Sequence, residues 1–580
     1  MSDLVIRFGG EGGEGVMSTG EFITRVFSRC GYHAHTFRTN PAEIKGGHAC
    51  FQVRVGKDTL LSAGDHVDVL LAFNQEAYDR HRDRIDSQGL LLYNSNETEV
   101  SENGTNAVGL PLVDIAVESA GAKLMKNTVA VGVLAGFLKL PLEVIEEMIK
   151  EKWARKGEKI VDGNIKALHA GAQYAAESIN VESRWTLPKL DINEERVFIS
   201  GNEALALGAL AAGCNFYAGY PITPASSVME WLAKYLPKYG GTMCQMEDEI
   251  SAITAVLGAS FSGAKAMTAT SGPGLSLIIE ALGLGIMCEV PCVIVDVMRG
   301  GPSTGLPTKV EQSDLNLAVY GGHGDAPRPV IALSSVEDCF YGMIRAFNMA
   351  ERLQTPVIVL SDQAMSTRNL TVPRYDLERV KAENRTMPKP SSDNNGGNGG
   401  SSAEYKRYLI TMDGVSPVSL PGTKGYNFVA TGLEHDEFGA PNYEPQVHTA
   451  MLAKRERKLE MANGTVEWSP RYGDESGDVG VMGWGGTEGT IREGVALAQD
   501  AGYKVPMIHP RLISPLPDKY LKKFYGQCKK VLVPELNHGG QFFHYLRSHY
   551  PEVEFISMTK CDGMPFTARE IFNGIRDANR

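Results

Sequence analysis

Two charged residues in the middle of the chain have the surroundings of a buried site. Glu249 opens a stretch, MEDEISAITAVLGAS (246–260), that reads as a helix rich in small residues, and Arg299 follows a very apolar strand at 291–297. Burial raises the pKa of a carboxyl group and keeps it able to share a proton. A guanidinium group binds a carboxylate through two parallel hydrogen bonds. These residue types favour a site that moves a proton and binds an anionic substrate.

Loops rich in glycine and hydroxyl groups accompany this pair. GYPITPASS (219–227) precedes a predicted helix, and Thr223 within it offers a hydroxyl group and a backbone N–H. TATSGPGLS (268–276) and MRGGPSTGLPT (298–308) each follow a short apolar strand. Loops at the carboxyl ends of parallel strands are where open α/β sheets bind ligands. We therefore expect these stretches at one edge of a parallel sheet.

Three of these stretches, YPITPASS, TSGPGLS and RGGPSTGLPT, resemble the pyrimidine-binding subunit of the 2-oxoacid:ferredoxin oxidoreductases, which use thiamine diphosphate. The resemblance implies that Glu249 is the catalytic carboxylate on the pyrimidine ring nitrogen, with Glu247 and Asp248 as rivals beside it. A surface helix cap for Glu249 and a structural ion pair for Arg299 are the alternatives. The expected substrate-binding residues are Thr223, Arg299, Tyr220 and Ser226, and the expected cofactor-binding residues are Pro221, Ile222, Glu249, Ser271 and Gly272.

A motif that thiamine enzymes normally carry is missing from the sequence. These enzymes hold the diphosphate and its Mg²⁺ with Gly-Asp-Gly and a later Asn, and neither Met-Asp-Gly (412–414) nor Cys-Asp-Gly (561–563) fits. Mg²⁺ needs oxygen ligands around the phosphates, and none of the nine cysteines forms a CxxC pair. We therefore expect no metal in this chain and only the pyrimidine half of the cofactor site. The resemblance implies a beta subunit with the diphosphate site, Mg²⁺ and a [4Fe–4S] cluster, in a dimer of alpha–beta heterodimers that passes electrons to ferredoxin.

The N-terminal stretch carries a second glycine-rich signal. GEGGEG (10–15) spells GxGxxG between a strand and a helix, which is the context of a phosphate-binding turn. The acid that a dinucleotide site needs after the second strand is absent, and Arg38 there suits an extra phosphate, as on NADP or coenzyme A. A glycine turn that only allows close packing is the alternative. By resemblance this part is the gamma component near the coenzyme A entrance, and the coenzyme A candidates are Gly12, Gly13, Arg38 and Lys45.

Composition limits the class of protein and its partners. A hydrophobic content of 43% and a charged content of 22% are ordinary for a soluble globular protein. The net charge of −12 argues against nucleic acid or an anionic membrane as the main partner. No apolar run reaches the ~20 residues of a membrane helix. No basic, apolar leader precedes the first strand, so we expect a cytoplasmic protein.

Alternating strands and helices predict an α/β protein of several domains, with a doubly wound parallel sheet in the pyrimidine-binding part. The 580 residues exceed what one core accommodates. The expected division is a gamma domain with a glycine-rich loop at 1–185, a pyrimidine-binding thiamine diphosphate domain at 190–385, a flexible linker at 386–404, an irregular connecting segment at 405–475 and a transketolase C-terminal-like α/β domain at 476–580.

The implied function is that of a fused gamma–alpha subunit of a 2-oxoacid:ferredoxin oxidoreductase, most like the 2-oxoglutarate type. Its reaction is the reversible, coenzyme A-dependent oxidative decarboxylation of 2-oxoglutarate to succinyl-CoA and CO₂, which fixes CO₂ when it runs backwards. Lys309 is a candidate partner for the second substrate carboxylate. Pyruvate and branched-chain 2-oxoacids stay open as substrates. A non-redox transketolase-type thiamine enzyme and an NADP-binding protein stay open as other classes.

Overall fold

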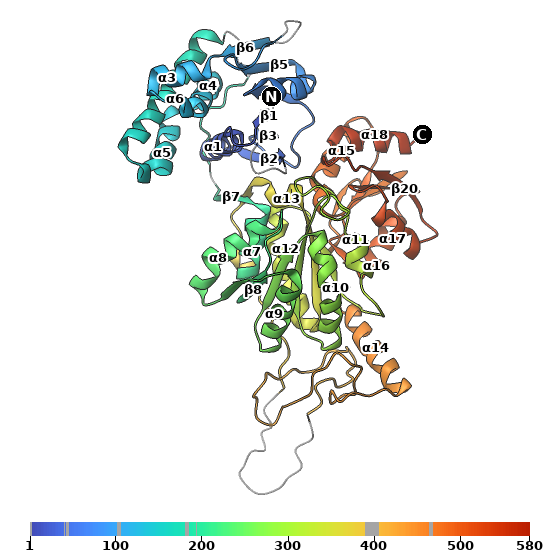
Figure 1. The fold of residues 1–580 in the computed structure, drawn as a ribbon. Helices are drawn as coiled ribbons and strands as arrows, with labels where there is room; N and C mark the ends of the chain where they lie inside the picture. The colour runs from blue at the N-terminus through green and yellow to red at the C-terminus, as the bar shows by residue number, and fades with distance from the viewer. Residues whose placement is uncertain are drawn as a thin grey trace. The chain divides into compact units, whose positions relative to one another are not determined.

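The computed structural model describes residues 3–39, 41, 46–100, 106–179, 185–192, 194–388, 405–462 and 468–580. Two compact units account for the chain: Met1–Ser200 with Thr367–Arg374, and Gly201–Ser366 with Tyr375–Arg580 (Figure 1). Lys45 and most of the linker expected at 386–404 lie outside the described residues. The domain boundaries drawn from the sequence stay a prediction. The α/β fold class with parallel sheets is confirmed.

The first unit is built on an eight-stranded sheet in the order β6-β5-β4-β1-β3-β2-β14-β7. Strands β6, β5, β4 and β1 are parallel, and every further pairing is antiparallel. The strands are β1 (Asp3–Glu11), β2 (His33–Thr39), β3 (His48–Gly56), β4 (Val67–Ala72), β5 (Ile85–Asn94), β6 (Asn106–Leu110), β7 (Arg196–Ser200) and β14 (Asn369–Pro373). The chain thus returns to this sheet at β14, after most of the central strands.

Close helix packing in the first unit depends on glycine. Helices α4 (Lys126–Leu138) and α6 (Glu158–Ser178) cross so tightly that a methyl group on Gly132 would lie 2.2 Å from the carbonyl oxygen of Leu168. The other helices of this unit are α1 (Val16–Arg29), α2 (Gln75–His81), α3 (Leu112–Ala120) and α5 (Leu142–Trp153). The KNTVAVG sequence that opens α4 therefore has a packing reason.

The second unit contains a seven-stranded sheet in the order β18-β12-β13-β11-β10-β8-β9, parallel except for β18. Its strands are β8 (Phe216–Gly219), β9 (Thr242–Gln245), β10 (Ala266–Thr270), β11 (Cys292–Met298), β12 (Val330–Ala332), β13 (Pro356–Asp362) and β18 (Leu512–Ser514). Its helices are α7 (Gly201–Ala211), α8 (Ser226–Tyr235), α9 (Glu249–Phe261), α10 (Gly272–Met287), α11 (Leu315–Tyr320), α12 (Val336–Leu353) and α13 (Gln363–Thr367). Helix α7 packs on α12, and α9 packs on α10.

The parallel strands bring the predicted site segments together. Because β11, β10, β8 and β9 are neighbours and run the same way, the loops that follow them emerge at one edge of the sheet. These are the loops that carry the motifs singled out in the sequence. The expectation that they share an edge is confirmed.

The C-terminal part of the second unit adds a five-stranded sheet in the order β15-β17-β16-β19-β20, parallel except for β15. Its elements are β15 (Arg471–Gly473), β16 (Val479–Met482), α15 (Glu488–Asp500), β17 (Pro506–Ile508), α16 (Asp518–Tyr525), β19 (Lys530–Glu535), α17 (Gln541–His549), β20 (Glu554–Thr559) and α18 (Ala568–Ala578). Strand β18 leaves this part to extend the seven-stranded sheet, and one hydrophobic core spans both.

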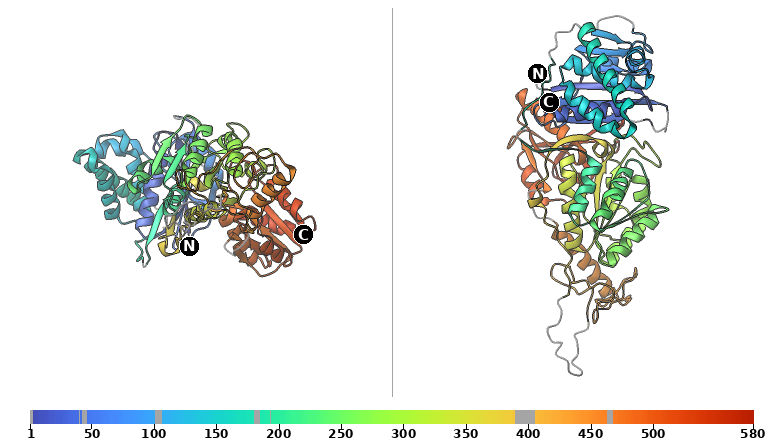
Figure 2. Two further views of the ribbon diagram at one scale, coloured as in Figure 1. Left: turned by 90° about the horizontal axis from the view of Figure 1, so that it is seen from below. Right: turned by 90° about the vertical axis from the view of Figure 1, so that its left-hand side faces the viewer.

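In the sequence, a connecting segment with little regular structure separates most of the seven-stranded sheet from the five-stranded sheet. Its described residues form irregular chain apart from helix α14 (Pro445–Glu460), as Figures 1 and 2 show. Across the described part of the chain, no helix combines the length and hydropathy that crossing a membrane requires.

Candidate active site

Glu249 is the first residue of α9 and is buried, with 6% of its surface exposed. Its carboxylate lies against Gly274 of α10. A methyl group on Gly274 would stand 2.5 Å from Glu249 Oε1 and 2.0 Å from Thr270 Oγ1, so only glycine fits there. Among the described residues, no N–H or O–H group donates a hydrogen bond to this carboxylate. The structure therefore holds a buried acid whose hydrogen-bonding capacity is unused.

The neighbouring acids have other surroundings. Asp248 is the N-cap of α9, where its Oδ1 accepts a hydrogen bond of 2.7 Å from the Ser251 backbone N–H, and Ser251 completes a capping box. These hydrogen bonds lower the pKa of Asp248. Glu247 and Asp248 are both exposed. Asp248 is thus the helix cap, and Glu249 is the acid that points inward.

The PITP loop (221–224) is fixed by hydrogen bonds from a residue of α7. Asn202 of α7 is fully buried, and its Nδ2 donates to the Pro224 carbonyl at 2.9 Å and lies 2.8 Å from Ser227 Oγ. The loop ends where α8 begins at Ser226. The side chains of Thr223 and Tyr220 are exposed at the loop surface. Sequence reasoning missed Asn202, because an Asn in an Ala/Gly-rich helix carries no local signal for what it contacts.

Arg299 joins the PITP loop to the loop that follows β11. Its Nη1 donates to the Thr223 carbonyl at 2.5 Å, and its Nη2 donates to the Thr304 carbonyl at 2.9 Å. The guanidinium group is buried, with no carboxylate in ion-pair range among the described residues. The expected pair Thr223 and Arg299 is therefore brought together. Because arginine has five N–H donors, three remain for a ligand, and the Nε–H has no partner in the described structure.

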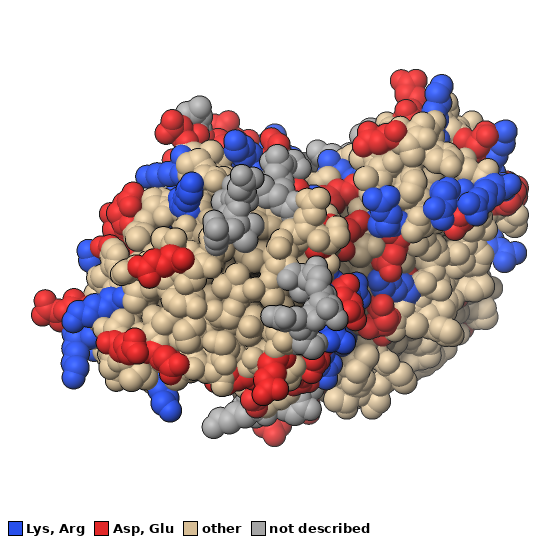
Figure 3. All heavy atoms as spheres, turned by 90° about the horizontal axis from the view of Figure 1, so that it is seen from above, with Lys and Arg blue, Asp and Glu red and all other residues tan. Residues whose placement is uncertain are grey.

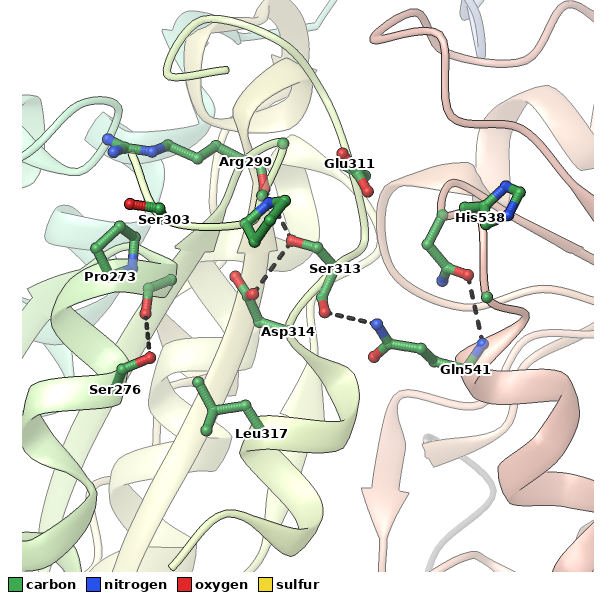
Figure 4. Close-up of a pocket in the computed structure, with 16 residues that line it drawn as sticks. Pro273, Ser276, Arg299, Ser303, Glu311, Ser313, Asp314, Leu317, His538 and Gln541 are labelled. Atoms are coloured by element: carbon green, nitrogen blue, oxygen red, sulfur yellow. Dashed lines mark hydrogen bonds between the residues drawn. The ribbon is translucent and has the colours of Figure 1, made fainter. Parts of the chain in front are cut away.

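A cavity of about 660 Å³ opens beside Arg299 (Figure 4). Residues from the segments 272–276, 299–303, 311–317 and 537–541 line it. Ser271 and Gly272, expected at the cofactor, lie at the start of α10, and Ser271 Oγ is buried without a hydrogen-bond partner in the described residues. Figure 4 shows Pro273, from the first turn of α10, together with Arg299 and Asp314, from the two ends of the loop between β11 and α11, around this cavity.

The loop after Arg299 is fixed on the C-terminal part of the unit. The Gln312 backbone N–H donates to the Leu536 carbonyl at 2.6 Å, and the Leu536 N–H donates to Gln312 Oε1 at 2.9 Å. Gln541 Nε2 donates to the Ser313 carbonyl at 2.7 Å (Figure 4). The ELNHGGQ sequence (535–541) therefore positions the loop at 299–314, which we call the substrate loop. The Glu535 carboxylate accepts hydrogen bonds from the first turn of α17.

Two carboxyl groups beneath the loop were not predicted from the sequence. Asp296 of β11 is completely buried, and neither of its carboxylate oxygens has a hydrogen-bond partner among the described residues. The neighbouring carboxyl group of Asp314 raises the pKa of Asp296, in addition to burial. Asp314 lies against Gly272, where a methyl group would be 2.9 Å from its Oδ2. We call Asp296 and Asp314 the carboxyl pair. Asp314 reaches the cavity, whereas Asp296 lies below it.

The coenzyme A candidates lie in the first unit, and their surroundings differ. The Gly12 N–H donates to the Gly47 carbonyl at 2.8 Å, so the GEGGEG loop lies against the chain at Gly46 and Gly47, directly after Lys45. Gly13 has a φ of 98° and open space above it. Arg38 instead forms an ion pair of 2.7 Å with Glu21 of α1. The structure therefore places Gly12 and Gly13 in one loop beside Gly46 and Gly47. Arg38 is paired instead with Glu21 of α1.

Charge on the surface is mixed in sign. Over the described part of the face drawn in Figure 3, acidic and basic side chains are interspersed and form no extended basic patch. Nucleic acid binding depends on such patches.

Comparisons with known proteins agree along the whole chain. The family model for pyruvate ferredoxin/flavodoxin oxidoreductase matches residues 5–174. The model for the thiamine diphosphate-binding part of pyruvate flavodoxin/ferredoxin oxidoreductase matches residues 207–454, and that for core domain II of pyruvate:ferredoxin oxidoreductase matches residues 477–571. The 2-oxoglutarate oxidoreductase subunit KorA of Mycobacterium tuberculosis is 35% identical over 100% of this chain and 92% of its own length. The chain belongs to the 2-oxoacid:ferredoxin oxidoreductase family.

Other members of the family agree in length and fold. The alpha subunit of 2-oxoacid:ferredoxin oxidoreductase 2 of Aeropyrum pernix is 30% identical over 99% of this chain and 98% of its own. The solved 2-oxoglutarate:ferredoxin oxidoreductase from Magnetococcus marinus, with 2-oxoglutarate, coenzyme A and succinyl-CoA bound, is 39% identical, covers both chains completely and superimposes with a TM-score of 0.93. The chain is thus an alpha-type subunit of this oxidoreductase family, and the recognition made from the motifs is confirmed.

Proposed function

We propose that the chain is the fused gamma–alpha subunit of a 2-oxoglutarate:ferredoxin oxidoreductase. With a partner beta subunit it catalyses the coenzyme A-dependent, reversible oxidative decarboxylation of 2-oxoglutarate to succinyl-CoA and CO₂, with electrons passed to ferredoxin. One observation carries the proposal: an unpartnered buried acid, Glu249, and a buried arginine with free donors, Arg299, come from loops at the same sheet edge. The Magnetococcus marinus relative, solved with 2-oxoglutarate bound, supports the choice of substrate.

The residues present fit the aminopyrimidine of thiamine diphosphate. When bound, this cofactor supplies a carbon nucleophile that adds to the 2-oxo carbon and accepts the electrons released by decarboxylation. Glu249 is proposed to hold a proton at the pyrimidine ring nitrogen, because its carboxylate is buried and unpartnered and a glycine at 274 leaves it room. The cofactor contacts proposed around it are Pro221, Ile222, Ser271 and Gly272.

The substrate carboxylate is proposed to bind at Arg299 and Thr223. Arg299 already joins two loops through hydrogen bonds, is buried, and lines the cavity. A pair of donors on one rigid plane suits a 2-oxoacid carboxylate. Tyr220 and Ser226 frame the same loop. For the second carboxylate of 2-oxoglutarate, Lys309 of the substrate loop is the candidate. Its aliphatic side chain packs against Gly563 of the C-terminal part.

A partner chain is proposed to complete the site. On α9 and α10, Ile250 and Leu277 are 50% and 48% exposed, and nothing lies within 4 Å of a methyl group built on Gly258 or Gly283. Glycine in a helix costs about 0.5–1 kcal/mol relative to alanine, so two glycines without a local packing reason indicate that another chain approaches closely. We assign this face to the beta subunit, which would bring the diphosphate site, Mg²⁺ and a [4Fe–4S] cluster, in a dimer of alpha–beta heterodimers.

Coenzyme A is proposed to bind at the glycine-rich loops of the first unit. Gly13 has open space above it, whereas Gly12 is hydrogen-bonded to the Gly46–Gly47 turn, which Lys45 precedes in the sequence. Phosphates favour such loops at helix N-termini. Arg38 is the weakest candidate, because Glu21 already neutralises it.

The test is co-expression of this chain with its beta subunit and measurement of coenzyme A-dependent reduction of a viologen dye with a panel of 2-oxoacids. The proposal predicts the highest kcat/KM for 2-oxoglutarate. A higher value for pyruvate or a branched-chain 2-oxoacid would overturn the substrate. Ketol transfer between sugars without dye reduction would instead favour a transketolase-type enzyme.

A further inference from the structure

The carboxyl pair brackets the loop that begins at Arg299. Asp296 is on β11, whose backbone pairs Asp296 with Thr270 of β10 and with Leu360 of β13, so it stands near the carboxyl edge in the middle of the sheet. Three residues later the strand delivers Arg299. Asp314 comes from the far end of the substrate loop and is the residue before α11. The loop thus returns toward the end of β11. Burial lowers the pKa of the Arg299 guanidinium group, and the charges of both acids act on that group to raise its pKa against the effect of burial.

Asp296 has no donor to stabilise a negative charge. It is 0% exposed, and within the described residues neither of its oxygens accepts a hydrogen bond from an N–H or O–H group. After burial, the strongest influence on its pKa is another carboxyl group, that of Asp314. Asp314 has one donor, Ser313 Oγ at 3.1 Å from its Oδ1. A buried carboxylate without donors is strongly unfavourable, and two carboxylates in contact repel each other. A proton between them removes both problems.

The charges around the pair are consistent with one shared proton. Burial, and then the carboxyl group of Asp314, raise the pKa of Asp296 well above its ordinary value. Burial also raises the pKa of Asp314, although the side chains of Asp296 and Ser313 oppose that rise. The other charged or titratable groups that face the pair are Arg299, and Glu311 and His538 across the cavity.

We propose that Asp296 retains a proton shared with Asp314, so that the carboxyl pair carries one negative charge and Arg299 keeps its attraction for an anionic substrate. This rests on the proposed binding of the 2-oxoacid carboxylate at Arg299. With two charges beside it, the guanidinium group would be over-neutralised, and an incoming carboxylate would meet net repulsion. Asp296 and Asp314 are therefore positioning residues that set the charge of the site.

The first measurement does not need turnover. Infrared spectra of the purified full chain at pH 7 are compared between wild type and Asp296→Asn. The proposal predicts a carbonyl-stretch band of a protonated carboxylic acid in the wild type that the variant lacks. Spectra without such a difference would overturn the proposal. Because no substrate is involved, this result stands whether or not 2-oxoglutarate is the substrate.

The second measurement uses the assembled complex and compares KM for the 2-oxoacid between variants that remove one or both carboxyl groups. Asp296→Asn should not lower KM for the 2-oxoacid, because it removes no charge if Asp296 is protonated. Relative to that variant, the double variant Asp296→Asn/Asp314→Asn should lower KM about tenfold, since it removes the remaining charge near the substrate anion. A fall in KM in the single variant would show that Asp296 is ionised and would overturn the proposal. If the two residues had only a structural role, kcat and KM would change in both variants, and KM would not fall specifically between the single and the double variant.

Discussion

Gly274 and Glu249 face each other at the sheet edge so closely that a methyl group on the glycine would stand 2.5 Å from the Glu249 carboxylate. The same methyl group would be 2.0 Å from Thr270 Oγ1. The loop after β10 is therefore shaped around the acid at the start of α9. This contact explains why the TSGPG turn carries glycine where α10 begins its first turn.

Gly274→Ala should displace the Glu249 side chain. We expect at least a tenfold loss of kcat in the assembled enzyme and a destabilisation of about 1–3 kcal/mol, as overpacking of a tight site usually gives. Turnover and the thermal unfolding midpoint are the measurements. Gly283→Ala on the same helix is the matched control for stability of the isolated chain, because its added carbon meets nothing within 4 Å. Equal stability of the two variants would contradict the packing argument.

Arg299→Lys tests whether the guanidinium group binds substrate. A lysine ammonium cannot span the Thr223 and Thr304 carbonyls and still offer two parallel donors. KM for the 2-oxoacid should rise at least tenfold. Arg328→Lys is the control, since Arg328 is equally buried but donates to the carbonyls of Ala318, Ala326 and Gly321. The control should reduce stability and leave KM near its original value; the opposite pattern would remove Arg299 from the substrate site.

Leu277→Asp tests the face assigned to the beta subunit. Leu277 is 48% exposed on α10, and a charge there should prevent co-purification of the two subunits if another chain covers it. Tyr239→Asp is the control on a residue that is 72% exposed elsewhere. Size-exclusion chromatography of the co-expressed chains measures the outcome. Intact assembly with Leu277→Asp would show that the interface lies on a different face.

A buried charge cluster predicts a pH dependence of stability. Glu289 is bound by Lys454 at 2.6 Å and by Lys458, all three fully or almost fully buried. Burial, opposed in part by Glu289, lowers the pKa of Lys458 from 10.5 to about 7. Between these values the unfolded chain binds more protons at this residue than the folded chain does. The Lys458 contribution to stability therefore rises as the pH increases through this window.

Lys458→Met should remove this pH-dependent term. The thermal unfolding midpoint of the wild type should gain more between pH 7 and pH 9 than that of the variant, and equal gains would contradict the assignment. Glu289→Gln is the counterpart, because it leaves two buried lysines without their counter-charge. It should destabilise the chain by about 3–5 kcal/mol at pH 7, as the loss of one partner of a buried ion pair does.

The sequence was sufficient for the sheet edge and for its main side chains. Apolar strands followed by glycine-rich loops are local patterns, and parallel strand order then places Thr223, Ser271 and Arg299 together. The acid was harder to assign, because Asp248 and Glu249 are adjacent and both suit a helix start. Only the structure separates the cap from the buried acid, since the capping box directs Asp248 outward.

The features that the sequence did not predict depend on contacts between distant residues. Asp296 sits in an apolar strand, and its pairing with Asp314 depends on the path of the whole substrate loop. Strand β14 joins a sheet whose other strands all precede it in the sequence. Arg38 of β2 was a candidate to meet a phosphate, and in the structure it forms an ion pair with Glu21 of α1. In each case the partner is set by tertiary structure rather than by spacing.

Turnover of the Glu249→Ala complex tests the central claim most directly. The co-expressed, assembled enzyme should lose at least a hundredfold in coenzyme A-dependent viologen reduction with 2-oxoglutarate, because the proposed proton relay depends on the Glu249 carboxylate. Its subunits should still co-purify, since Glu249 lies in the cofactor cradle and not on the exposed face of α9. An assembled variant that turns over at the wild-type rate would contradict the account.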